Sequence, residues 1–426
     1  MNSIKVLVIS HNCFSNSSNM GITLSSYFDC FSSDNIAQLF FHEEIPNVVT
    51  AKTYFRFTDT DALKSIFIRG QFGKAIIPNI NLDDSTAIGE KLSSLYNYGR
   101  KRTPIIYILR NLIWRLSSWY SKKLKDWLIS FNPDVIFFAS GDYSFSYRIA
   151  LKISKFLSKP LVVSCMDDYY IYNRNQRQLF GKICFNAFLK SVRKVVGYSS
   201  GIVCLNKKMA FEYRRLFSKP TFIYYKSVKP NLTNNNIREG FCYLGGLSLG
   251  RHSSLIKLAN IIHSINEHYF VDVFSSESDK KIVNEITSCD AIRFHGKVNA
   301  EKVVEIERRA KFLLFIESSS FSNYIRYSLS TKIPEYLASG ACLIAFGPND
   351  VASIEYLADN QCACVVENKD DAKALISAFL NDKNEQNRVL NNARITSLAN
   401  HSREKNGIEF KKWLVSICDK ELEEKL

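Results

Sequence analysis

The chain has 426 residues, of which 46% are hydrophobic and 23% charged, a composition that excludes a disordered, collagen-like or low-complexity protein. Its 56 lysines and arginines exceed its 41 aspartates and glutamates, so the formal charge of +15 predicts anionic partners such as phosphorylated ligands, acidic lipids or nucleic acid. At about 100–200 residues per domain, this length predicts two or three domains.

The N-terminal residues predict a buried strand and not a targeting segment. Residues 4–9 form a short apolar run, and a polar stretch follows at once, without the basic start and cleavage site of a secretory signal. No stretch reaches the roughly 18 apolar residues of a membrane-spanning helix. The 11 cysteines are scattered without a C-x-x-C pair, which predicts free thiols in a reducing cytosol and no zinc site.

Short continuous apolar runs, separated by helical patterns, predict parallel strands that are buried on both faces. In the first half these runs are residues 6–10, 37–42, 135–140, 161–165 and 201–205. The pattern restarts in the second half at residues 240–244, 270–275, 291–295, 312–317, 341–346 and 364–366.

A polar, turn-rich stretch at residues 229–239 is the predicted linker between the two halves. The sequence therefore predicts an α/β protein with two facing Rossmann-like domains and an interdomain cleft. The first domain covers residues 1–228 and the second covers residues 240–404. A helix near residues 405–426 is expected to pack back on the first domain.

The segment 328–348 predicts a loop, a short helix and a buried strand. Ser330, Thr331 and Lys332 fall at the helix entrance, where the helix dipole attracts an anion and the lysine adds a full positive charge. Glu335 follows one turn later, where its carboxylate is placed to accept hydrogen bonds from a ribose diol. The alternative is an ordinary capped helix with a solvated Glu335.

Two Rossmann-like halves with this segment in the second resemble a GT-B glycosyltransferase of the retaining family-four type, in its bacterial surface-polysaccharide branch. In that family two glutamates, eight positions apart, precede such a glycine and strand, and the second holds the ribose of a sugar nucleotide. The resemblance gives this role to Glu335. Tyr327 stands where the first glutamate is usual, which leaves the donor-sugar contact and the stereochemical outcome open.

Gly245 and Gly246 follow the strand that opens the second half, and paired glycines let the backbone approach a ligand closely. The family has an arginine after the first glycine and a basic residue about six positions on, which together clamp the diphosphate. Gly246 replaces that arginine. Arg251 or His252 falls at the second position, and Arg251 is preferred because a guanidinium binds phosphate bidentately. Lys332 would supply the missing arm; a glycine turn with a solvated Arg251 is the alternative.

Two further strand ends of the second half supply donor-binding candidates. Glu317 ends an apolar strand and either caps residues 318–320 or reaches the hydroxyls of the donor sugar. His295 and Lys297 follow another strand, and the resemblance implies that this loop lies against the nucleotide base. A plain turn is the alternative for His295.

The first half supplies the acceptor side. A polar loop runs from His11 and Asn12 to Gly21, and it resembles the GT-B loop that reaches towards the donor phosphate and the acceptor. Gly21 would permit close approach at the helix start.

Carboxylates follow two predicted strands of the first half, as Asp142 and as the pair Asp167 and Asp168. An aspartate at such a place can act as a base or bind an acceptor hydroxyl. Capping and solvation are the alternatives. No strand end carries an Asp-x-Asp motif, so the sequence predicts no metal and no cofactor apart from the nucleotide-sugar substrate.

Residues 100–125 contain no acidic residue, and their basic residues alternate with Trp, Tyr, Ile and Leu at helical spacing. This pattern is typical of an interfacial helix on an anionic membrane. A helix packed on the sheet with a basic solvent face is the alternative. The lysines and arginines at the two ends of the segment are Arg100, Lys101, Arg102, Lys122, Lys123 and Lys125.

These features predict a glycosyltransferase that moves a sugar from a nucleotide-sugar donor to a lipid-linked or oligosaccharide acceptor. The resemblance implies a retaining enzyme of O-antigen- or capsule-type polysaccharide biosynthesis, peripheral on the inner face of the cytoplasmic membrane. Arg251 and Lys332 would stabilise the leaving diphosphate. The alternatives are a sugar-nucleotide 2-epimerase of the same fold and a non-catalytic basic module that binds membrane or nucleic acid. No nucleic-acid motif is present, so nucleic acid is not a predicted partner.

Overall fold

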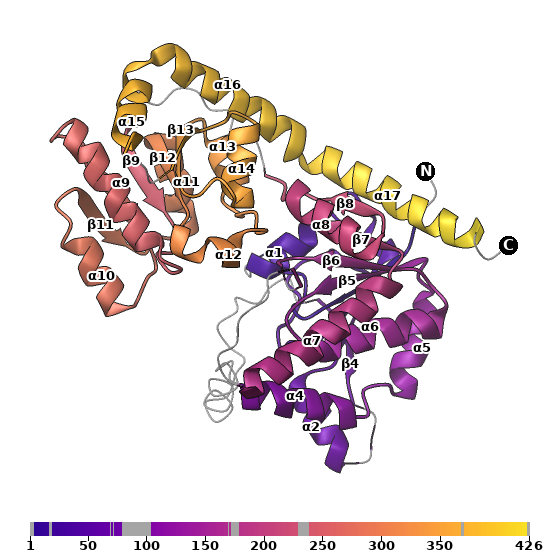
Figure 1. Cartoon of the computed structure of the whole chain (residues 1–426). Helices are drawn as coiled ribbons and strands as arrows, with labels where there is room; N and C mark the ends of the chain where they lie inside the picture. The colour runs from indigo at the N-terminus through magenta and orange to yellow at the C-terminus, as the bar shows by residue number, and fades with distance from the viewer. Residues whose placement is uncertain are drawn as a thin grey trace. The chain divides into compact units, whose positions relative to one another are not determined.

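The structure is a computed structural model that describes residues 4–16, 19–68, 70, 72–78, 104–168, 170–171, 179–228, 238–367 and 370–423 (Figure 1). It divides into two compact units: unit 1 is Met1–Tyr224 with Glu404–Leu426, and unit 2 is Tyr225–Arg403. The chain therefore passes between the units twice. Most of the predicted linker, residues 229–237, lies outside the described residues.

Unit 1 contains an eight-stranded sheet with the order β4-β3-β2-β1-β5-β6-β7-β8, in which only the β3–β4 pair is antiparallel. Its strands are β1 (Val6–Ser10), β2 (Ile36–Phe40), β3 (Thr53–Arg56), β4 (Lys74–Ile76), β5 (Val135–Ser140), β6 (Leu161–Cys165), β7 (Gly201–Cys204) and β8 (Thr221–Ile223). Its helices are α1 (Asn19–Ser26), α2 (Asp59–Phe67), α4 (Pro104–Leu116), α5 (Lys122–Phe131), α6 (Ser144–Leu157), α7 (Leu179–Tyr198), α8 (Lys207–Phe217) and α17 (Arg403–Glu423).

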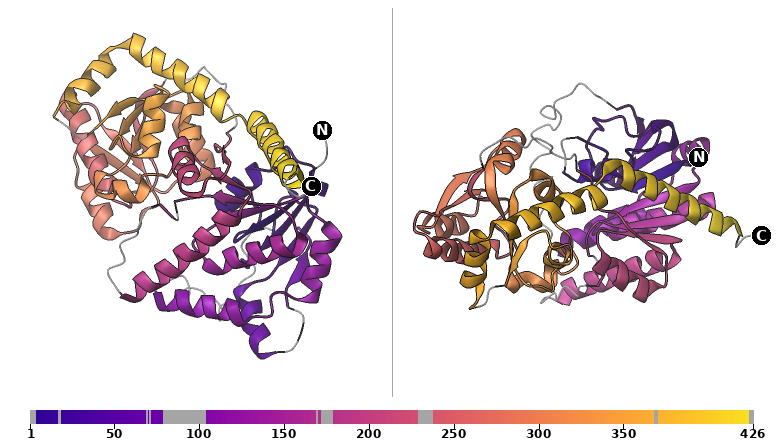
Figure 2. Two further views of the ribbon diagram at one scale, coloured as in Figure 1. Left: turned by 45° about the vertical axis from the view of Figure 1, so that its right-hand side comes forward. Right: turned by 90° about the horizontal axis from the view of Figure 1, so that it is seen from above.

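The central strands of this sheet are buried and mostly apolar because helices cover both faces. Val6 and Val8 belong to one buried cluster with Leu24 of α1 and Phe410 of α17. On another strand, Phe138 packs edge-on against Tyr147 of α6 with ring centroids 5.0 Å apart. Figures 1 and 2 show α17, in yellow, lying along unit 1, as the shared cluster requires.

Unit 2 contains a six-stranded parallel sheet with the order β11-β10-β9-β12-β13-β14. Its strands are β9 (Glu239–Leu244), β10 (Val271–Phe274), β11 (Ile292–Gly296), β12 (Ala310–Ile316), β13 (Cys342–Phe346) and β14 (Cys364–Val366). Its helices are α9 (Arg251–Ile265), α10 (Lys280–Thr287), α11 (Ala300–Arg309), α12 (Ser322–Ile325), α13 (Ile333–Ser339), α14 (Ala352–Asp359), α15 (Ala372–Asn381) and α16 (Lys383–Asn400).

Alternate residues of the central strand β12 enter different cores. Phe312 and Leu314 belong to a cluster with residues of α9, α10 and α15, whereas Leu313 and Phe315 belong to a second cluster with residues of α11, α13 and α14. This alternation is the two-residue period of a strand covered on both faces.

Each sheet has a point where the strand order reverses. In unit 1 the first strand, β1, lies between β2 and β5, and in unit 2 the first strand, β9, lies between β10 and β12. Ligands of open parallel sheets bind beyond the carboxyl ends of the strands at such reversals. A ligand site is therefore expected among the residues that follow β1 and β5 in unit 1, and among those that follow β9 and β12 in unit 2.

Candidate functional site

A cavity of ≈ 160 Å³ lies at the carboxyl ends of β9 and β12 in unit 2. Its polar lining includes Gly246 after β9, Arg251 at the start of α9, Glu317 after β12, and Ser330 and Lys332 before α13. Five residues for which the sequence predicted a donor-binding or catalytic role thus share one cavity at the strand-order reversal.

Arg251 and Glu317 form a bidentate ion pair. Arg251 Nε donates to Glu317 Oε2 at 3.0 Å, and Arg251 Nη2 lies 2.9 Å from Oε2 and 3.2 Å from Oε1. Only 4% of the Glu317 side chain is exposed, and this burial raises its pKa while the guanidinium opposes the rise. Glu317 does not cap the next turn, as one alternative expected; Ser318 Oγ accepts the Ser320 N–H instead.

Lys332 is a cation without a carboxylate partner in salt-bridge range among the residues that the structure describes. Its ammonium lies 5.3 Å from the ring centroid of Tyr243. Burial, reinforced by the positive charge of Arg251, lowers the pKa of Lys332 to about 8. A buried ammonium beside a guanidinium is poised to receive an anion, which would relieve both the desolvation and the repulsion.

Gly245 makes room for this ammonium. Its φ of +154° is one that side chains rarely adopt, and its N–H is held by the carbonyl of Phe274 at 2.9 Å. A Cβ at this position would overlap Lys332 Nζ. The glycine at position 245 therefore leaves space for the ammonium of Lys332. The sequence alone could not show which side chain fills the space beside this glycine.

Tyr336 fixes the position of α13, the helix that carries Glu335. Its hydroxyl donates to the carbonyl of Leu244 at 3.1 Å and accepts the Leu244 N–H at 3.3 Å, so α13 is pinned to the last residue of β9. The ring is buried. Sequence analysis missed this residue, because its partner lies far away in the sequence.

Glu335 lies at the same end of α13, and 40% of its side chain is exposed. Lys226 Nζ lies 2.7 Å from Glu335 Oε1 and donates to the carbonyl of Thr331 at 3.1 Å. Ser330 is held separately, since its N–H donates to Ser353 Oγ at 3.0 Å. Lys226 is a second residue that the sequence analysis missed.

Glu307 of α11 is a buried carboxylic acid close to this group. Burial and the negative charge of Glu335 raise the pKa of Glu307 to about 7, against the effect of Lys226 and Lys332. No local pattern singled out this residue, because an acidic side chain on an amphipathic helix is ordinarily solvated.

Arg251, and not the neighbouring His252, faces the cavity. His252 Nε2 lies 3.2 Å from Glu285 Oε2, and its Nδ1 lies 3.2 Å from the Leu247 carbonyl. The first two N–H groups of α9 are already bonded to the carbonyls of Ser248 and Leu247. The positive charge at this end of the cavity therefore comes chiefly from the side chains of Arg251 and Lys332.

His295 does not lie in a loop, as expected, but within β11. Its Nε2 lies 2.6 Å from Asp272 Oδ1 on the adjacent strand, and its ring stacks on Phe274 with centroids 4.6 Å apart. Lys297 follows the strand and is exposed.

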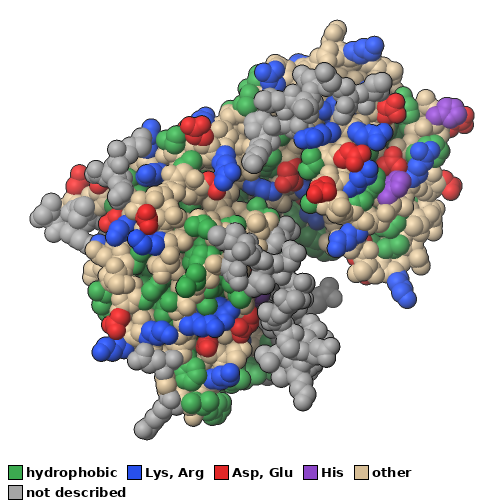
Figure 3. Space-filling model, turned by 180° about the vertical axis from the view of Figure 1, so that it is seen from behind, with side chains coloured by type: hydrophobic (Ala, Val, Ile, Leu, Met, Phe, Trp, Pro, Cys, Tyr) green, Lys and Arg blue, Asp and Glu red, His purple; other side chains and the backbone are tan. Residues whose placement is uncertain are grey.

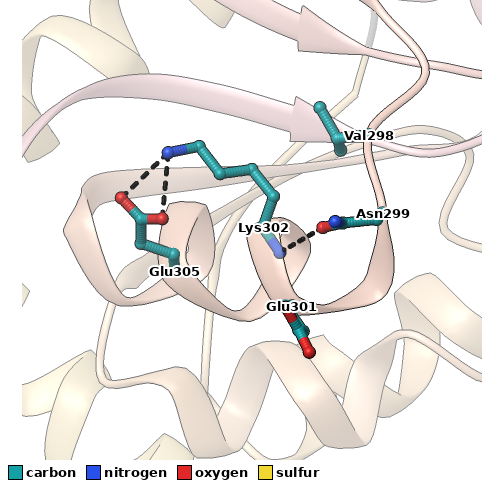
Figure 4. A pocket seen from close by; sticks show the side chains of 5 residues that line it. All are labelled: Val298, Asn299, Glu301, Lys302 and Glu305. Carbon is teal, nitrogen blue, oxygen red and sulfur yellow. Dashed lines mark hydrogen bonds and ion pairs between the residues drawn. The ribbon is translucent and has the colours of Figure 1, made fainter.

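A larger surface hollow of ≈ 420 Å³ lies at the start of α11 (Figure 4). Its lysine, Lys302, is paired with Glu305 at 2.9 and 3.0 Å, and Asn299 caps the Lys302 N–H. Because its charges are paired with each other, the hollow has less to offer an anion than the cavity at β9 and β12.

In unit 1 the reversal point is lined by aromatic and polar side chains. The His11 ring lies 4.7 Å from that of Tyr143, which follows β5, and 5.4 Å from that of His42, which follows β2. Asn12 donates to both carboxylate oxygens of Glu44 at 3.2 Å, and His42 Nδ1 lies 3.1 Å from Oε1 of the same carboxylate. Burial, with the charges of nearby Arg110 and His42, lowers the pKa of His11 well below its ordinary value, so its ring is neutral.

The predicted aspartates of unit 1 serve its loops. Asp168 Oδ1 accepts the N–H groups of Tyr170 and Ile171 at 3.1 and 2.8 Å, and Asp167 Oδ1 accepts the Asp168 N–H at 2.8 Å. Asp142 lies in the loop after β5 and raises the pKa of Tyr107, behind the effect of burial.

Gly21 is required by its own loop. A Cβ at this position would lie 2.8 Å from the carbonyl oxygen of Cys13. No group of three or more His, Cys, Asp or Glu side chains suited to a metal ion occurs among the described residues.

Comparison with known proteins agrees with this architecture. Residues 259–410 match the model of a glycosyl transferase-like family. No curated protein sequence matches the chain. HepE of Anabaena, solved with UDP, superposes with a TM-score of 0.62 at 10% identity over 97% of this chain and 100% of its own. The chain has the GT-B fold, and its residues 259–410 form a glycosyl transferase-like domain.

Two further glycosyltransferase structures show how widely the same fold is shared. The sucrose-phosphate synthase of Thermosynechococcus elongatus has a TM-score of 0.62 at 10% identity, over 97% of this chain and 99% of its own. S. aureus TarM, in complex with fondaparinux, α-GlcNAc-glycerol and UDP, has a TM-score of 0.56 at 12% identity, over 97% and 100%. Of the cavity's charged residues, Glu317 and Lys332 lie within the matched residues 259–410, and Arg251 lies just before them.

Gly245→Ala is expected to displace Lys332 and to weaken binding of a nucleoside diphosphate by at least ~10-fold, or ~1.4 kcal/mol. The substitution also introduces backbone strain of about 1–3 kcal/mol, so thermal unfolding must be measured beside calorimetric titration. Gly197→Ala is the control, because nothing lies within 4 Å of a Cβ there. The double variant with Lys332→Ala should bind no worse than Lys332→Ala alone; a further loss would contradict a mechanism through Lys332.

Nucleoside diphosphate affinity is expected to fall as the pH rises above about 8. The pKa of Lys332 is about 8 in the free protein, and a bound anion raises it, so binding takes up a proton above that pH. The dissociation constant should therefore rise towards tenfold per pH unit. Titrations at pH 7.5, 8.5 and 9.5 measure this slope, which should be absent in Lys332→Met. An equal slope in both proteins would assign the titration to another group.

Proposed function

We propose that the protein transfers a sugar from a nucleotide-sugar donor to a lipid-linked or oligosaccharide acceptor in surface-polysaccharide biosynthesis. The observation that carries the proposal is the cavity at β9 and β12, where Arg251 converges with the ammonium of Lys332, which has no carboxylate partner in salt-bridge range among the described residues. Lys332 lies within the glycosyl transferase-like match and Arg251 just before it. HepE is described with UDP and with UDP-glucose, and TarM with UDP and a GlcNAc-glycerol, which favours a nucleotide-sugar donor here.

In the proposed reaction, the bond between the sugar C1 and the diphosphate oxygen breaks, and negative charge develops on the diphosphate. Lys332 and Arg251 stabilise that charge from fixed positions, with little reorganisation during the reaction. The acceptor hydroxyl forms the new bond to C1, and its proton passes to the leaving diphosphate. This route retains the configuration and needs no covalent enzyme intermediate.

Glu335 is proposed to bind the ribose hydroxyls of the donor. Its carboxylate is 40% exposed, and Lys226 occupies a single position on Oε1, so acceptor sites remain for two hydroxyl groups. The donor sugar would lie nearer Glu317, whose two oxygens are both engaged by Arg251. In this arrangement Glu317 orients Arg251.

The test of the function is a panel of sugar nucleotides. One member is expected to raise the melting temperature, because a ligand that binds the folded state at 100 times its dissociation constant adds ~2.7 kcal/mol of stability. The same member should release its nucleoside diphosphate faster when polyprenyl-phosphate-linked sugars or oligosaccharides are added. Glu335→Ala should lose the thermal shift. Isomerisation of the sugar nucleotide without an acceptor would favour the 2-epimerase alternative.

The segment 100–125, predicted as an interfacial helix, contributes to two helices in the structure, α4 and α5. Arg100, Lys101 and Arg102 lie outside the described residues. Trp114 is buried, stacked on Phe145 with centroids 4.1 Å apart, and therefore belongs to the core. No helix among the described residues is long and apolar enough to cross a bilayer.

The opposite face of α4 is nevertheless apolar and exposed. Five aliphatic side chains that share one face of the helix are 44–74% exposed: Ile105, Ile108, Leu109, Leu112 and Leu116. Exposed basic residues accompany them, among them Arg115, Lys122 and Lys123. Figure 3 shows hydrophobic side chains exposed between Lys and Arg side chains on one face of the molecule. We propose that this stripe, the α4 stripe, rests on an anionic membrane that carries the acceptor.

Co-sedimentation with vesicles tests the α4 stripe. The protein is expected to pellet with phosphatidylglycerol vesicles at low salt, less with phosphatidylcholine, and less as salt rises, since each basic residue near the surface contributes about 1 kcal/mol. The triple variant Ile105→Gln, Leu109→Gln, Leu112→Gln should stay in the supernatant. Its matched control is Ile395→Gln with Leu398→Gln, two exposed aliphatic residues of α16. Equal pelleting of both variants would rule out the stripe.

A further inference from the structure

Lys226 holds the carboxylate of Glu335, the residue that is predicted to bind the donor ribose. Its ammonium lies 2.7 Å from Glu335 Oε1 and 3.1 Å from the Thr331 carbonyl, so it bridges the entrance of α13 to the acidic side chain one turn later. Only 23% of the Lys226 side chain is exposed, so water screens this contact less than it screens a surface pair.

The main chain of Lys226 is fixed independently of its side chain. Lys226 lies two residues after the first passage of the chain between the units, and His401 lies two residues before the end of unit 2. His401 Nδ1 lies 2.8 Å from the Lys226 carbonyl, and the Val228 N–H donates to the His401 carbonyl at 3.0 Å. The two connecting segments are thus bonded to each other within unit 2.

The proton position on His401 follows from its partners. A carbonyl only accepts, so Nδ1 carries the proton and Nε2 accepts from the Tyr356 hydroxyl at 2.9 Å. That hydroxyl in turn accepts from Asn400 Nδ2 at 3.0 Å. Burial lowers the pKa of His401 to about 4, so the ring is neutral and this arrangement persists at physiological pH. A substitution of the Lys226 side chain leaves these bonds in place.

We propose that Lys226 is a positioning residue: its ammonium holds the Glu335 carboxylate in the orientation that receives the ribose hydroxyls of the donor, and thereby ties the nucleotide site to the two connecting segments. The proposal rests on the proposed function. Nothing in the local sequence of either residue indicates the contact, since the two lie 109 positions apart.

Lys226 positions Glu335 without competing with the ribose. A carboxylate has about four lone-pair sites, and Lys226 uses one of them. The Thr331 bond restrains the ammonium from a second direction, so Oε1 is held and the plane of the carboxylate is set. The charge of Glu335 raises the pKa of Glu307, so the two carboxylates repel each other. Without Lys226, the Glu335 side chain, which is 40% exposed, would turn towards water and away from Glu307.

The experiment compares binding of ADP, GDP, CDP and UDP with binding of their 2′,3′-dideoxy analogues by calorimetry. With the nucleotide that binds best, Lys226→Met is expected to weaken binding about 10-fold, or ~1.4 kcal/mol. With the dideoxy analogue, which lacks the hydroxyls that Glu335 binds, the loss should fall below about 2-fold. Lys226→Arg should recover part of the affinity, and Lys226→Met should add little to Glu335→Gln.

Lys302→Met is the matched control, because it breaks a lysine–glutamate pair of similar length on the surface of α11 (Figure 4). It should bind both nucleotides as the wild type does. Melting temperatures check that each variant is folded. Equal losses for the ribose and dideoxy nucleotides would make Lys226 a general counter-charge and overturn the proposal, as would unchanged or tighter binding. If no nucleoside diphosphate binds the wild type, the proposed function falls with it.

Discussion

The covering of both sheets on both faces is the constraint from which the rest of the structure follows. A strand such as β12 sends Leu314 into one core and Leu313 into another, so its buried residues have no face left for a charged group. The charged groups of the cavity therefore follow the strands and do not lie within them. Glu317 follows β12 directly, and Gly245 and Gly246 follow β9 directly. These two strands lie side by side at the point where the strand order reverses.

The cavity at this point is an arrangement of partly compensated charges. Arg251 is matched by Glu317, and Lys226 is matched by Glu335. Lys332 lacks such a match among the described residues, and burial with the charge of Glu335 raises the pKa of Glu307 to about 7, so that acid is only about half ionised at neutral pH. An unpaired buried ammonium costs free energy in the empty protein. A bound anion such as the proposed diphosphate would remove that cost, and the free energy released would add to its affinity.

Features set by neighbouring residues, such as buried strands, could be predicted from the sequence, whereas contacts between residues far apart in the chain could not. Strands buried on both faces are continuous apolar runs, so β1, β5, β6 and β14 match the predicted ranges residue for residue, whereas the three- and four-residue strands β3, β4 and β8 lacked a readable pattern. Arg251 and Lys332 stand in recognisable segments. Tyr336 and Lys226 act on partners 92 and 109 positions away, which no local pattern shows. Periodicity predicted an amphipathic α4 but not which face is buried, and Trp114 proved to be core.

The helix α13 links these observations, because its seven residues carry contacts in two directions. Tyr336 ties it to the last residue of β9, which sets the place of Lys332 beside Gly245. Glu335, on the neighbouring position, points to Lys226 and so to the connecting segments. Adjacent helical residues face about 100° apart, and that angle lets Tyr336 face the end of β9 while Glu335 faces Lys226.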